Sequence, residues 1–312
     1  MGYVGYSVYS KERSNRIFLC IRGKSMKKRH ILWATGLAIL LAAGCGKAKN
    51  TEWKVTQYAD ESGLQANFYT LSSNRGELII IDGGSEQNAG QVKEVIRENG
   101  GEVDAWILTH PHPDHIGAFV KLYGDKDIKI DAVYDNGVDY EEYDSVDQEW
   151  DDIAVLQEYE ELTESASNVE SVEEGDVLQF SDLSLHFLNS YRKGMSQTTK
   201  DMPNNSSLVF TVESEDKSML FMGDCYDETL GKQMMQNYDT ELEVDYVQVS
   251  HHGNHTMCRE FYEKTKAKAA FFDAPEWLIQ GEQFDTQKNM AEMEELGMQI
   301  YDYTSCPNEV DL

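Results

Sequence analysis

The sequence predicts an α/β protein in which two β-sheets pack against each other and helices cover their outer faces. From residue 53 onward, apolar segments with strand composition alternate with segments of helical spacing. Segments 177–188 and 207–222 have the spacing of β-hairpins, and no internal repeat divides the chain. Hydrophobic residues make up 40% of the 312 positions and aromatic residues 11%, which is enough for a sizeable core. We therefore expect one large folded domain.

The elements of this domain follow from local patterns. The third expected strand ends at the tight turn Asp82-Gly83-Gly84, and the first expected helix stops at Gly100-Gly101. An acidic stretch with scattered aromatic residues, 139–174, includes a helix near 153–162. The other expected strands and helices before the first hairpin lie at 53–58, 65–71, 77–81, 91–98, 105–108, 116–123 and 128–134. After the second hairpin we expect alternating helices and strands at 227–236, 244–249, 259–266, 269–272, 287–296 and, as the last strand, 299–303.

The first 45 residues have a different composition from the rest. They hold eight Lys and Arg against one acid, so they carry +7 while the remainder of the chain carries −36. The basic stretch 26–29 precedes an apolar run at 31–44, which is shorter than the roughly 20 residues of a transmembrane helix. A basic start, a short apolar run and small residues at its end define a secretory signal.

The end of that run, Leu41-Ala42-Ala43-Gly44-Cys45, resembles a bacterial lipobox, which implies cleavage before Cys45 and lipidation of its thiol. An ordinary signal peptide with an incidental cysteine is the alternative. We expect residues 1–45 to be a signal and lipoprotein segment, with translation starting at Met26. Residues 46–52 then form a tether and 53–312 the domain, on the extracellular face of a bacterial membrane.

Composition limits the partners. The chain has 27 Lys and Arg against 56 Asp and Glu, a net charge of −29. Phosphate backbones and anionic lipid surfaces attract basic faces, and so acidic a composition does not favour one. Binding to nucleic acid is therefore possible but not favoured. Five cysteines in 312 residues do not make a disulfide scaffold.

Six of the eight histidines fall into two clusters, and the first is His110-Pro-His112-Pro-Asp114-His115. His110 and His112 alternate in an extended segment just after a buried strand, so both rings can point the same way. The prolines stiffen this segment, and Asp114 and His115 lie where the next helix begins. Two nitrogen ligands for one ion, with an oxygen and nitrogen pair for a second, fit a binuclear zinc or manganese site.

Two later strand ends supply further candidates. Asp224, in Met222-Gly223-Asp224, offers a carboxylate to bridge two ions, and the second histidine cluster begins with His251 and His252. Two ions about 3.5–4 Å apart can deprotonate a water and stabilise a displacement reaction. A single structural metal is the simpler alternative, but structural zinc sites favour closed Cys/His shells.

These motifs together resemble the metallo-β-lactamase superfamily. The resemblance rests on Asp82-Gly83-Gly84, on Thr109 through Gly117 and on Gly223-Asp224, in the same order along 53–304. It implies a four-layer αβ/βα sandwich. Asn204-Asn205-Ser206-Ser207 and Ser250-His251-His252-Gly253 are similar to the hydrolase domain of bacterial competence (DNA-uptake) channel proteins and to phosphorylcholine esterase. The separate ligand histidine of true β-lactamases is missing, which favours phosphodiesters over β-lactams.

The resemblance also implies roles for the candidate residues. His110 and His112 would bind one ion, Asp114 and His115 the other, with Asp224 bridging. One of His251 and His252 would complete the coordination of the second ion, while the other contacts phosphate or the leaving group. The choice between them is open, with a preference for His252, whose position before a small residue is similar to that of the ligand histidine in related nucleases. Asp82 would hold the histidine loop from behind, and Asn204 and Asn205 would border the substrate.

The sequence therefore predicts a monomeric phosphodiesterase or phosphoesterase that uses two divalent ions and the hydroxide they generate, with Asp114, His251 and His252 as catalytic residues. A nuclease of the competence-protein type and a non-catalytic surface-binding lipoprotein are the alternatives. The aromatic and acidic residues in 134–159 suit a quaternary ammonium group. A solvated acidic flap with aromatic rings packed beneath it is the alternative that we prefer.

Overall fold

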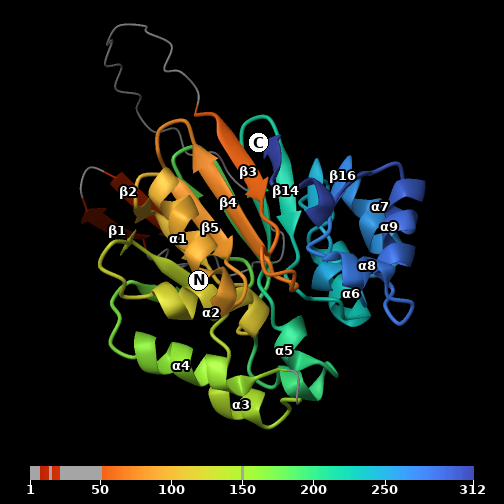
Figure 1. Ribbon diagram of the computed structural model, residues 1–312, viewed down its shortest axis with the longest axis horizontal. Coiled ribbons are helices and arrows are strands. Elements are labelled where there is room, and N and C mark those ends of the chain that lie inside the picture. The colour runs from red at the N-terminus through yellow and green to blue at the C-terminus, as the bar shows by residue number, and fades with distance from the viewer. Residues whose placement is uncertain (1–7, 14–15, 22–50, 149–150) are drawn as a thin grey trace, which may run out of the picture.

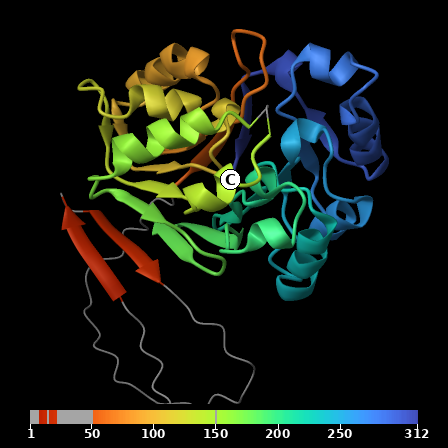
Figure 2. The same ribbon diagram turned by 90° about the horizontal axis from the view of Figure 1, so that it is seen from below.

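Two β-sheets lie face to face at the centre of the protein, with helices on their outer sides (Figure 1). The computed structural model describes residues 8–13, 16–21, 51–148 and 151–312. Figure 2, seen from below, shows α1 (Ala89–Glu98), α2 (Pro113–Leu122) and α4 (Ile153–Thr163) on one side of the sheets and the C-terminal helices on the other. The predicted four-layer α/β sandwich is confirmed.

The first sheet carries the N-terminal half of the candidate site. Its seven strands are β10 (Val169–Ser171), β9 (Val133–Asp135), β7 (Ala105–Ile107), β5 (Leu78–Asp82), β4 (Phe68–Ser73), β3 (Trp53–Gln57) and β18 (Asn308–Asp311), in that order. β5 and β7 are parallel, with Ile79 opposite Ala105. Their C-terminal ends therefore meet at one edge of the sheet, where Asp82 and the first histidine cluster follow them.

The second sheet carries the C-terminal half of the site. Its strands are β1 (Val8–Arg13), β2 (Arg16–Ile21), β11 (Val177–Phe180), β12 (Leu183–Asn189), β13 (Val209–Glu213), β14 (Ser218–Phe221), β15 (Tyr246–Gln248), β16 (Ala269–Phe271) and β17 (Gln299–Tyr301), in that order. β14 and β15 are parallel. Asp224 and His251 follow these two strands, so they too meet at one edge. A short separate pair joins β6 (Glu102–Val103) to β8 (Lys129–Ile130).

The remaining helices are short or flank the second sheet. They are α3 (Tyr140–Asp144), α5 (Met202–Asn205), α6 (Glu228–Asn237), α7 (Arg259–Thr265), α8 (Glu276–Gln280) and α9 (Thr286–Glu295). Single 3₁₀ turns occur at η1 (Glu86–Asn88), η2 (Met195–Gln197), η3 (His251–Gly253) and η4 (Tyr303–Ser305).

The alternation of side chains along each strand builds two cores. In β5, Ile79 and Ile81 face the second sheet, while Leu78 and Ile80 pack under the helices. All four are fully buried. A strand buried on both faces reads as a continuous apolar run, as 78–81 does. The strands that lead to the site are therefore packed on both faces.

Most expected elements are present, and four differences concern their bounds or neighbours. The predicted strand 128–134 is split into β8 and β9, and the acidic stretch holds α3 and β10 besides the expected α4. The strand at 299–303 is not the last one, because β18 follows it and pairs with β3. α2 begins at Pro113 rather than at residue 116, with proline in the first turn, where its missing N–H costs nothing.

Several predictions for the N-terminus lie outside the described residues. These are the signal at 26–44, the lipidation at Cys45 and most of the tether. β2 pairs with β11, which does not bear on the predicted start at Met26, so that start stays a prediction. No helix among the residues that the structure describes is both long and apolar enough to cross a bilayer.

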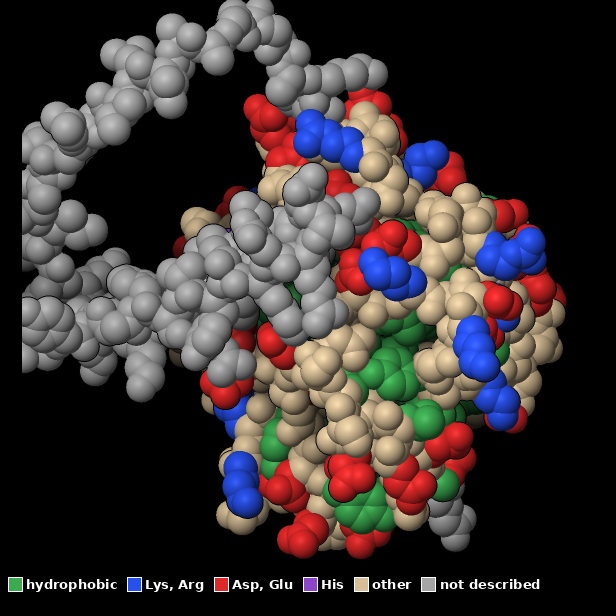
Figure 3. Space-filling model, turned by 90° about the vertical axis from the view of Figure 1, so that its left-hand side faces the viewer, with side chains coloured by type: hydrophobic (Ala, Val, Ile, Leu, Met, Phe, Trp, Pro, Cys, Tyr) green, Lys and Arg blue, Asp and Glu red, His purple; other side chains and the backbone are tan. Residues whose placement is uncertain are grey.

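The acidic surface is mixed rather than uniform on the face shown in Figure 3. There, acidic side chains are interspersed with basic ones around apolar patches. The net charge of −29 is thus not gathered into a single acidic patch on this face.

Candidate metal centre

The first histidine cluster joins the end of β7 to the start of α2. His112 has extended backbone (φ −79°, ψ 150°) and caps the helix, so Asp114 and His115 lie in its first turn. The rings of His110 and His112 lie side by side, with centroids 4.5 Å apart. The predicted alternation therefore brings both imidazoles to the same side of the segment.

Asp82 holds this cluster from behind. It ends β5 in left-handed backbone with φ 54° and is fully buried. Its Oδ1 accepts the Thr109 backbone N–H at 2.7 Å, and its Oδ2 accepts the Thr109 hydroxyl at 2.7 Å and the Asn67 amide at 2.6 Å. The same Oδ2 lies 2.7 Å from Nδ1 of His115. A carboxylate there keeps the proton of His115 on Nδ1 and leaves Nε2 free as a ligand atom.

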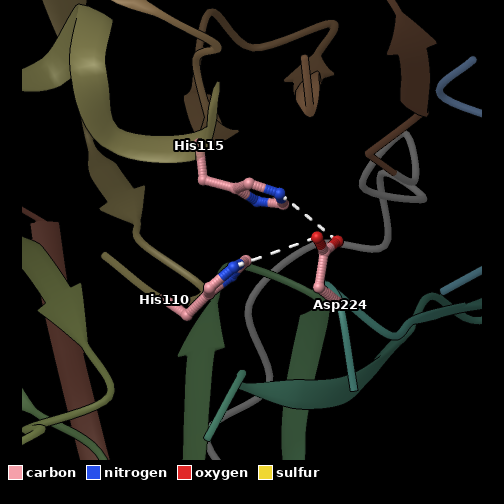
Figure 4. A group of neighbouring side chains, drawn as sticks. All are labelled: His110, His115 and Asp224. Carbon is pink, nitrogen blue, oxygen red and sulfur yellow. Dashed lines mark ion pairs between the residues drawn. The ribbon is translucent and has the colours of Figure 1, made fainter. Parts of the chain in front are cut away.

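Asp224 approaches from the other sheet, in the turn after β14. Gly223 has φ 49°, and a Cβ there would lie 2.9 Å from Cβ of Ser207, so the turn needs glycine. The Ser207 hydroxyl accepts the Asp224 N–H at 3.0 Å. Asp224 Oδ1 lies 3.3 Å from Nε2 of His115, and Oδ2 lies 3.9 Å from Nε2 of His110. Figure 4 shows the three side chains converging on one point.

His252 faces the same point from η3. Its Nε2 lies 3.1 Å from Oδ2 of Asp114 and 3.4 Å from Oδ2 of Asp224. Its Nδ1 lies 2.9 Å from the backbone carbonyl of Asp273, which can only accept, so Nδ1 carries the proton. This places Nε2 of His252 toward the carboxylates. Burial lowers the pKa of His252, but Asp224 and Asp114 outweigh it and raise that pKa to about 10, so Nε2 gives up a proton when it binds a metal. His252 is 2% exposed.

The geometry defines two potential ligand groups. One is His110, His115 and Asp224, and the other is Asp114, His115 and His252; within each, the ligand atoms lie within 4.8 Å of one another. His112 belongs to neither group, although its ring is next to that of His110. The pairing of His110 with His112 on one ion therefore stays a prediction.

The side-chain atoms around this point fit divalent ions. Nε2 of His110, His112, His115 and His252, and Oδ1 of Asp224, are buried without a hydrogen-bond partner. Orphaned buried polar atoms are rare and costly, which calls for something to bind them. Imidazole nitrogens with carboxylate oxygens are the donors that zinc and manganese take.

The pKa values of Asp224, Asp114 and His110 shift toward the forms that bind a metal. Those of His115 and His252 are raised by the same carboxylates, so these two rings lose a proton on metal binding. Burial opposes ionisation of Asp224, but His115 and His252 outweigh it and hold its pKa well below the usual range. Burial likewise opposes ionisation of Asp114, yet its contacts with His252 and His115 lower its pKa. Burial, with His115 next to it, lowers the pKa of His110 well below its usual value. Ionised carboxylates and a neutral imidazole are the forms that bind a metal.

His251 lies beside the centre rather than in either ligand group. Its ring stacks on Tyr226 with centroids 5.2 Å apart and planes 12° apart. Its Nδ1 is buried without a hydrogen-bond partner. Burial lowers the pKa of His251, so the ring is neutral near neutral pH and can donate one hydrogen bond and accept another.

The two predicted substrate-bordering asparagines are both buried, and they differ. The Asn205 carboxamide is committed: its Oδ1 accepts the N–H groups of Tyr226 and Asp227 at 2.8 Å, and its Nδ2 donates to Thr199 at 3.0 Å. Asn205 thus holds the loop after Asp224. Asn204 donates to Asp201 at 2.9 Å, but its Oδ1 is buried without a partner. Of the two, Asn204 keeps a free group that suits a ligand.

Three residues near the centre were not singled out from the sequence. Gln65 Nε2 donates to Asp114 Oδ2 at 2.6 Å, and the Asp273 carbonyl orients His252. Asp151 Oδ1 lies 3.2 Å from Nε2 of His112. None sits in a spacing pattern with the histidines. Asp273 follows directly after a buried apolar strand, as Asp82 does, and this was the one available signal.

The aromatic residues of the acidic stretch are packed inside. Tyr134, Tyr143 and Tyr159 are 7%, 0% and 7% exposed, which favours the packed flap over an open aromatic cage. Trp150 lies outside the described residues. A cavity of about 420 Å³ behind His110 and Pro111 has Asp135, Tyr159 and Glu160 among its lining residues.

Comparison with known proteins places the chain in a family. Residues 62–225 match the metallo-beta-lactamase superfamily, and they include Asp82, the first histidine cluster and Asp224. The chain belongs to the metallo-beta-lactamase superfamily. His251 and His252 lie beyond the matched residues, so their assignment rests on the geometry above.

Two individual similarities accompany this match. Over 174 residues, 55% of the chain, the sequence is 32% identical to ComE operon protein 3 of Bacillus subtilis (strain 168). The match spans 20% of the length of that relative. The fold is similar to that of the metallo-beta-lactamase fold protein YhfI of Bacillus subtilis, with a TM-score of 0.53 and 12% identity, covering 84% of this chain and 100% of YhfI.

Proposed function

We propose that this superfamily member is a metal-dependent phosphodiesterase or phosphoesterase that acts as a monomer outside the cell, anchored to the membrane through Cys45. The observation that carries the metal dependence is the set of buried imidazole Nε2 atoms without hydrogen-bond partners around Asp224. Two divalent ions, zinc or manganese, would be held there and would supply a hydroxide and a Lewis acid at neutral pH.

Three side chains around the ions would have separate roles. Asp114, fixed by the Gln65 amide at 2.6 Å, would bind a metal and orient the attacking oxygen. His252, fixed by the Asp273 carbonyl, would be a metal ligand. His251, outside both ligand groups and neutral, would steady the phosphate or the leaving oxygen through a hydrogen bond from its ring N–H.

Phosphodiesters are favoured over β-lactams because the chain lacks a ligand histidine between the first cluster and Asp224. In the described part of 116–223 the one histidine is His186, in β12. It pairs across the sheet with Thr211 and Val177, away from the strand ends. A small or cell-surface phosphodiester fits an acidic domain better than a long nucleic-acid strand, because bound metal ions supply positive charge only locally.

A nuclease of the competence-protein type is the second candidate, favoured by the 32% identity to ComE operon protein 3. The two candidates differ in substrate length and in salt dependence. Binding to a DNA strand weakens steeply with added salt, whereas turnover of a small diester does not.

The test combines metal analysis with turnover. The full chain is loaded with zinc or manganese, its metal content is measured, and bis-p-nitrophenyl phosphate, p-nitrophenyl phosphocholine and single-stranded DNA are offered as substrates. We expect two ions per chain, turnover of the small diesters, and loss of turnover on chelation. Asp114→Ala and Asp224→Ala should abolish turnover.

Other outcomes discriminate among the alternatives. Hydrolysis of DNA alone would replace the proposal with the nuclease. Absence of bound metal and of turnover with either added ion would leave a surface-binding lipoprotein. Retained activity in Asp224→Ala would refute the assigned centre.

A further inference from the structure

One buried pair of side chains remains outside the two ligand groups. Asp151, in the turn before α4, points its Oδ1 at Nε2 of His112, at a distance of 3.2 Å. Asp151 is 1% exposed and His112 7% exposed. Both facing atoms are buried and make no hydrogen bond. A nitrogen and a carboxylate oxygen thus face each other at the distance of an ion pair, without the geometry of a hydrogen bond.

The separation suits two ligands of one ion. A tetrahedral zinc ion with Zn–N and Zn–O distances of about 2.0–2.1 Å holds neighbouring donor atoms about 3.3 Å apart. The observed 3.2 Å between Nε2 and Oδ1 is close to this value. A carboxylate buried to this degree is unfavourable unless it is paired or binds a metal.

The ion expected at His110 and His112 also needs another protein ligand. Catalytic zinc sites commonly have three protein ligands and an open position. Asp224 Oδ2 is 3.9 Å from Nε2 of His110. Among the described residues neither Asp224 nor Asp151 forms a three-residue ligand group with His112, and His186 lies in β12, away from the centre. Asp151 is the carboxylate that contacts His112.

The fold fixes Asp151 in this orientation. Its Oδ2 accepts the Gln148 N–H at 2.6 Å, which leaves Oδ1 to face His112. The turn leads directly into α4, and α4 packs on α2, the helix that His112 caps. Both partners are therefore held by the same pair of helices.

We propose that Asp151 is a ligand of the metal ion that His110 and His112 bind. The inference rests on the proposed metal centre, but not on a phosphodiester substrate. The alternative is that Asp151 only orients His112, as a hydrogen-bond acceptor from Nε2. In that arrangement Nε2 carries a proton and cannot be a ligand atom.

The test measures metal binding rather than turnover. Asp151→Asn keeps an oxygen for the Gln148 N–H but loses the charged ligand. Asp152→Asn is the matched control, because Asp152 is exposed and has left-handed backbone (φ 47°), which asparagine also adopts. Metal content is measured in the full chain after gel filtration, and affinity is measured by chelator competition. The cobalt(II) absorption spectrum reports the ligand set.

We expect wild type and Asp152→Asn to bind two ions each. Asp151→Asn should retain one ion, and the affinity of the other site should fall by roughly 100-fold. This is at or beyond the largest loss seen when a residue that only orients a metal ligand is removed. The inference is overturned if Asp151→Asn binds two ions with affinity within about twofold of wild type and an unchanged cobalt spectrum. That result would assign the orienting role to Asp151.

A zinc-loaded crystal structure of wild type decides the point independently of how the variants fold. An Asp151 oxygen within about 2.0–2.2 Å of the zinc supports the inference, and a separation beyond about 3 Å overturns it. Absence of metal from wild type would refute both the proposed centre and this inference. Two bound ions without turnover of any phosphodiester would count against the proposed function alone.

Discussion

The two histidine clusters reach the same point with different backbones. The first, 110–115, runs from a strand end into α2 through extended and helical conformations. The second, 251–255, forms a turn in which His251, His252 and His255 all have positive φ, at 52°, 54° and 54°. Left-handed backbone in a residue other than glycine costs of order 1–3 kcal/mol and persists only when the surroundings hold it in place.

The difference shows what each cluster depends on. The first is ordinary backbone steadied from behind by the Asp82 carboxylate. In the second, the turn is held by the Asp273 carbonyl on His252 and by the Asn289 amide, which donates to the Gly253 carbonyl at 2.7 Å. Strain concentrated in the second cluster aims one ring inward and leaves its neighbour beside the centre.

The largest effects are expected when His251 and His252 are replaced by alanine one at a time. His252→Ala removes a ring whose Nε2 lies 3.1 Å from Asp114, and should weaken one metal site by about 100-fold or more. His251→Ala should keep both ions and lower turnover by about 10²-fold, the scale of one group that stabilises charge in the transition state. Metal content and steady-state rates on a nitrophenyl diester measure both.

The reverse pattern would break the comparison. Loss of a metal in His251→Ala, with full binding in His252→Ala, would mean that the turn presents the other ring to the ions. Equal loss in both would mean that the second cluster acts as one unit.

The same contrast explains which parts of the site can be predicted from the sequence. The alternation of His110 and His112 after a buried strand, with Asp114 and His115 at a helix start, was enough to foresee how this segment lies against Asp224. Alternation could not choose between His251 and His252, because positive φ at both breaks the strand rule. Nor could it find Asp151 or Asp273, which reach the centre through tertiary packing of α4 on α2 and of β16 on β15.

Metal binding by the first cluster should depend on the Asp82 carboxylate behind it. Asp82→Asn retains a residue that tolerates the left-handed backbone but places an amide where the Thr109 hydroxyl, the Asn67 amide and His115 need an acceptor. We expect metal affinity to fall by about 10–100-fold, as for other partners behind a ligand. Chelator competition measures this, and Asp216→Asn, at an exposed residue in the turn between β13 and β14, is a control outside the ligand groups. An unchanged affinity would mean that α2 alone positions His115.

The second cluster should be the more sensitive to a single added methyl group. A Cβ on Gly253, whose φ is 80°, would lie 2.4 Å from Cδ1 of Phe272. A Cβ on Gly117, in α2, would lie 2.6 Å from the Glu86 backbone N, but alanine favours the helix by up to about 1 kcal/mol. Gly253→Ala should therefore lower the free energy of unfolding by about 2–3 kcal/mol and Gly117→Ala by less. Urea denaturation of the metal-free variants compares them, and the opposite order would place the greater constraint in the first cluster.

The smallest effect is expected at His255, the last histidine of the second cluster. It is exposed and has φ 54°, and its ring makes edge contacts with Tyr226 and His251 at centroid distances of 6.2 and 6.0 Å. His255→Asn gives up those contacts but relieves left-handed strain, so the free energy of unfolding should change by less than about 0.5 kcal/mol. Metal content should stay at two ions, and turnover within about twofold of wild type. A tenfold loss of turnover with both ions in place would show that His255 acts on substrate together with His251, and the strained turn would then carry one ligand and two substrate-facing rings.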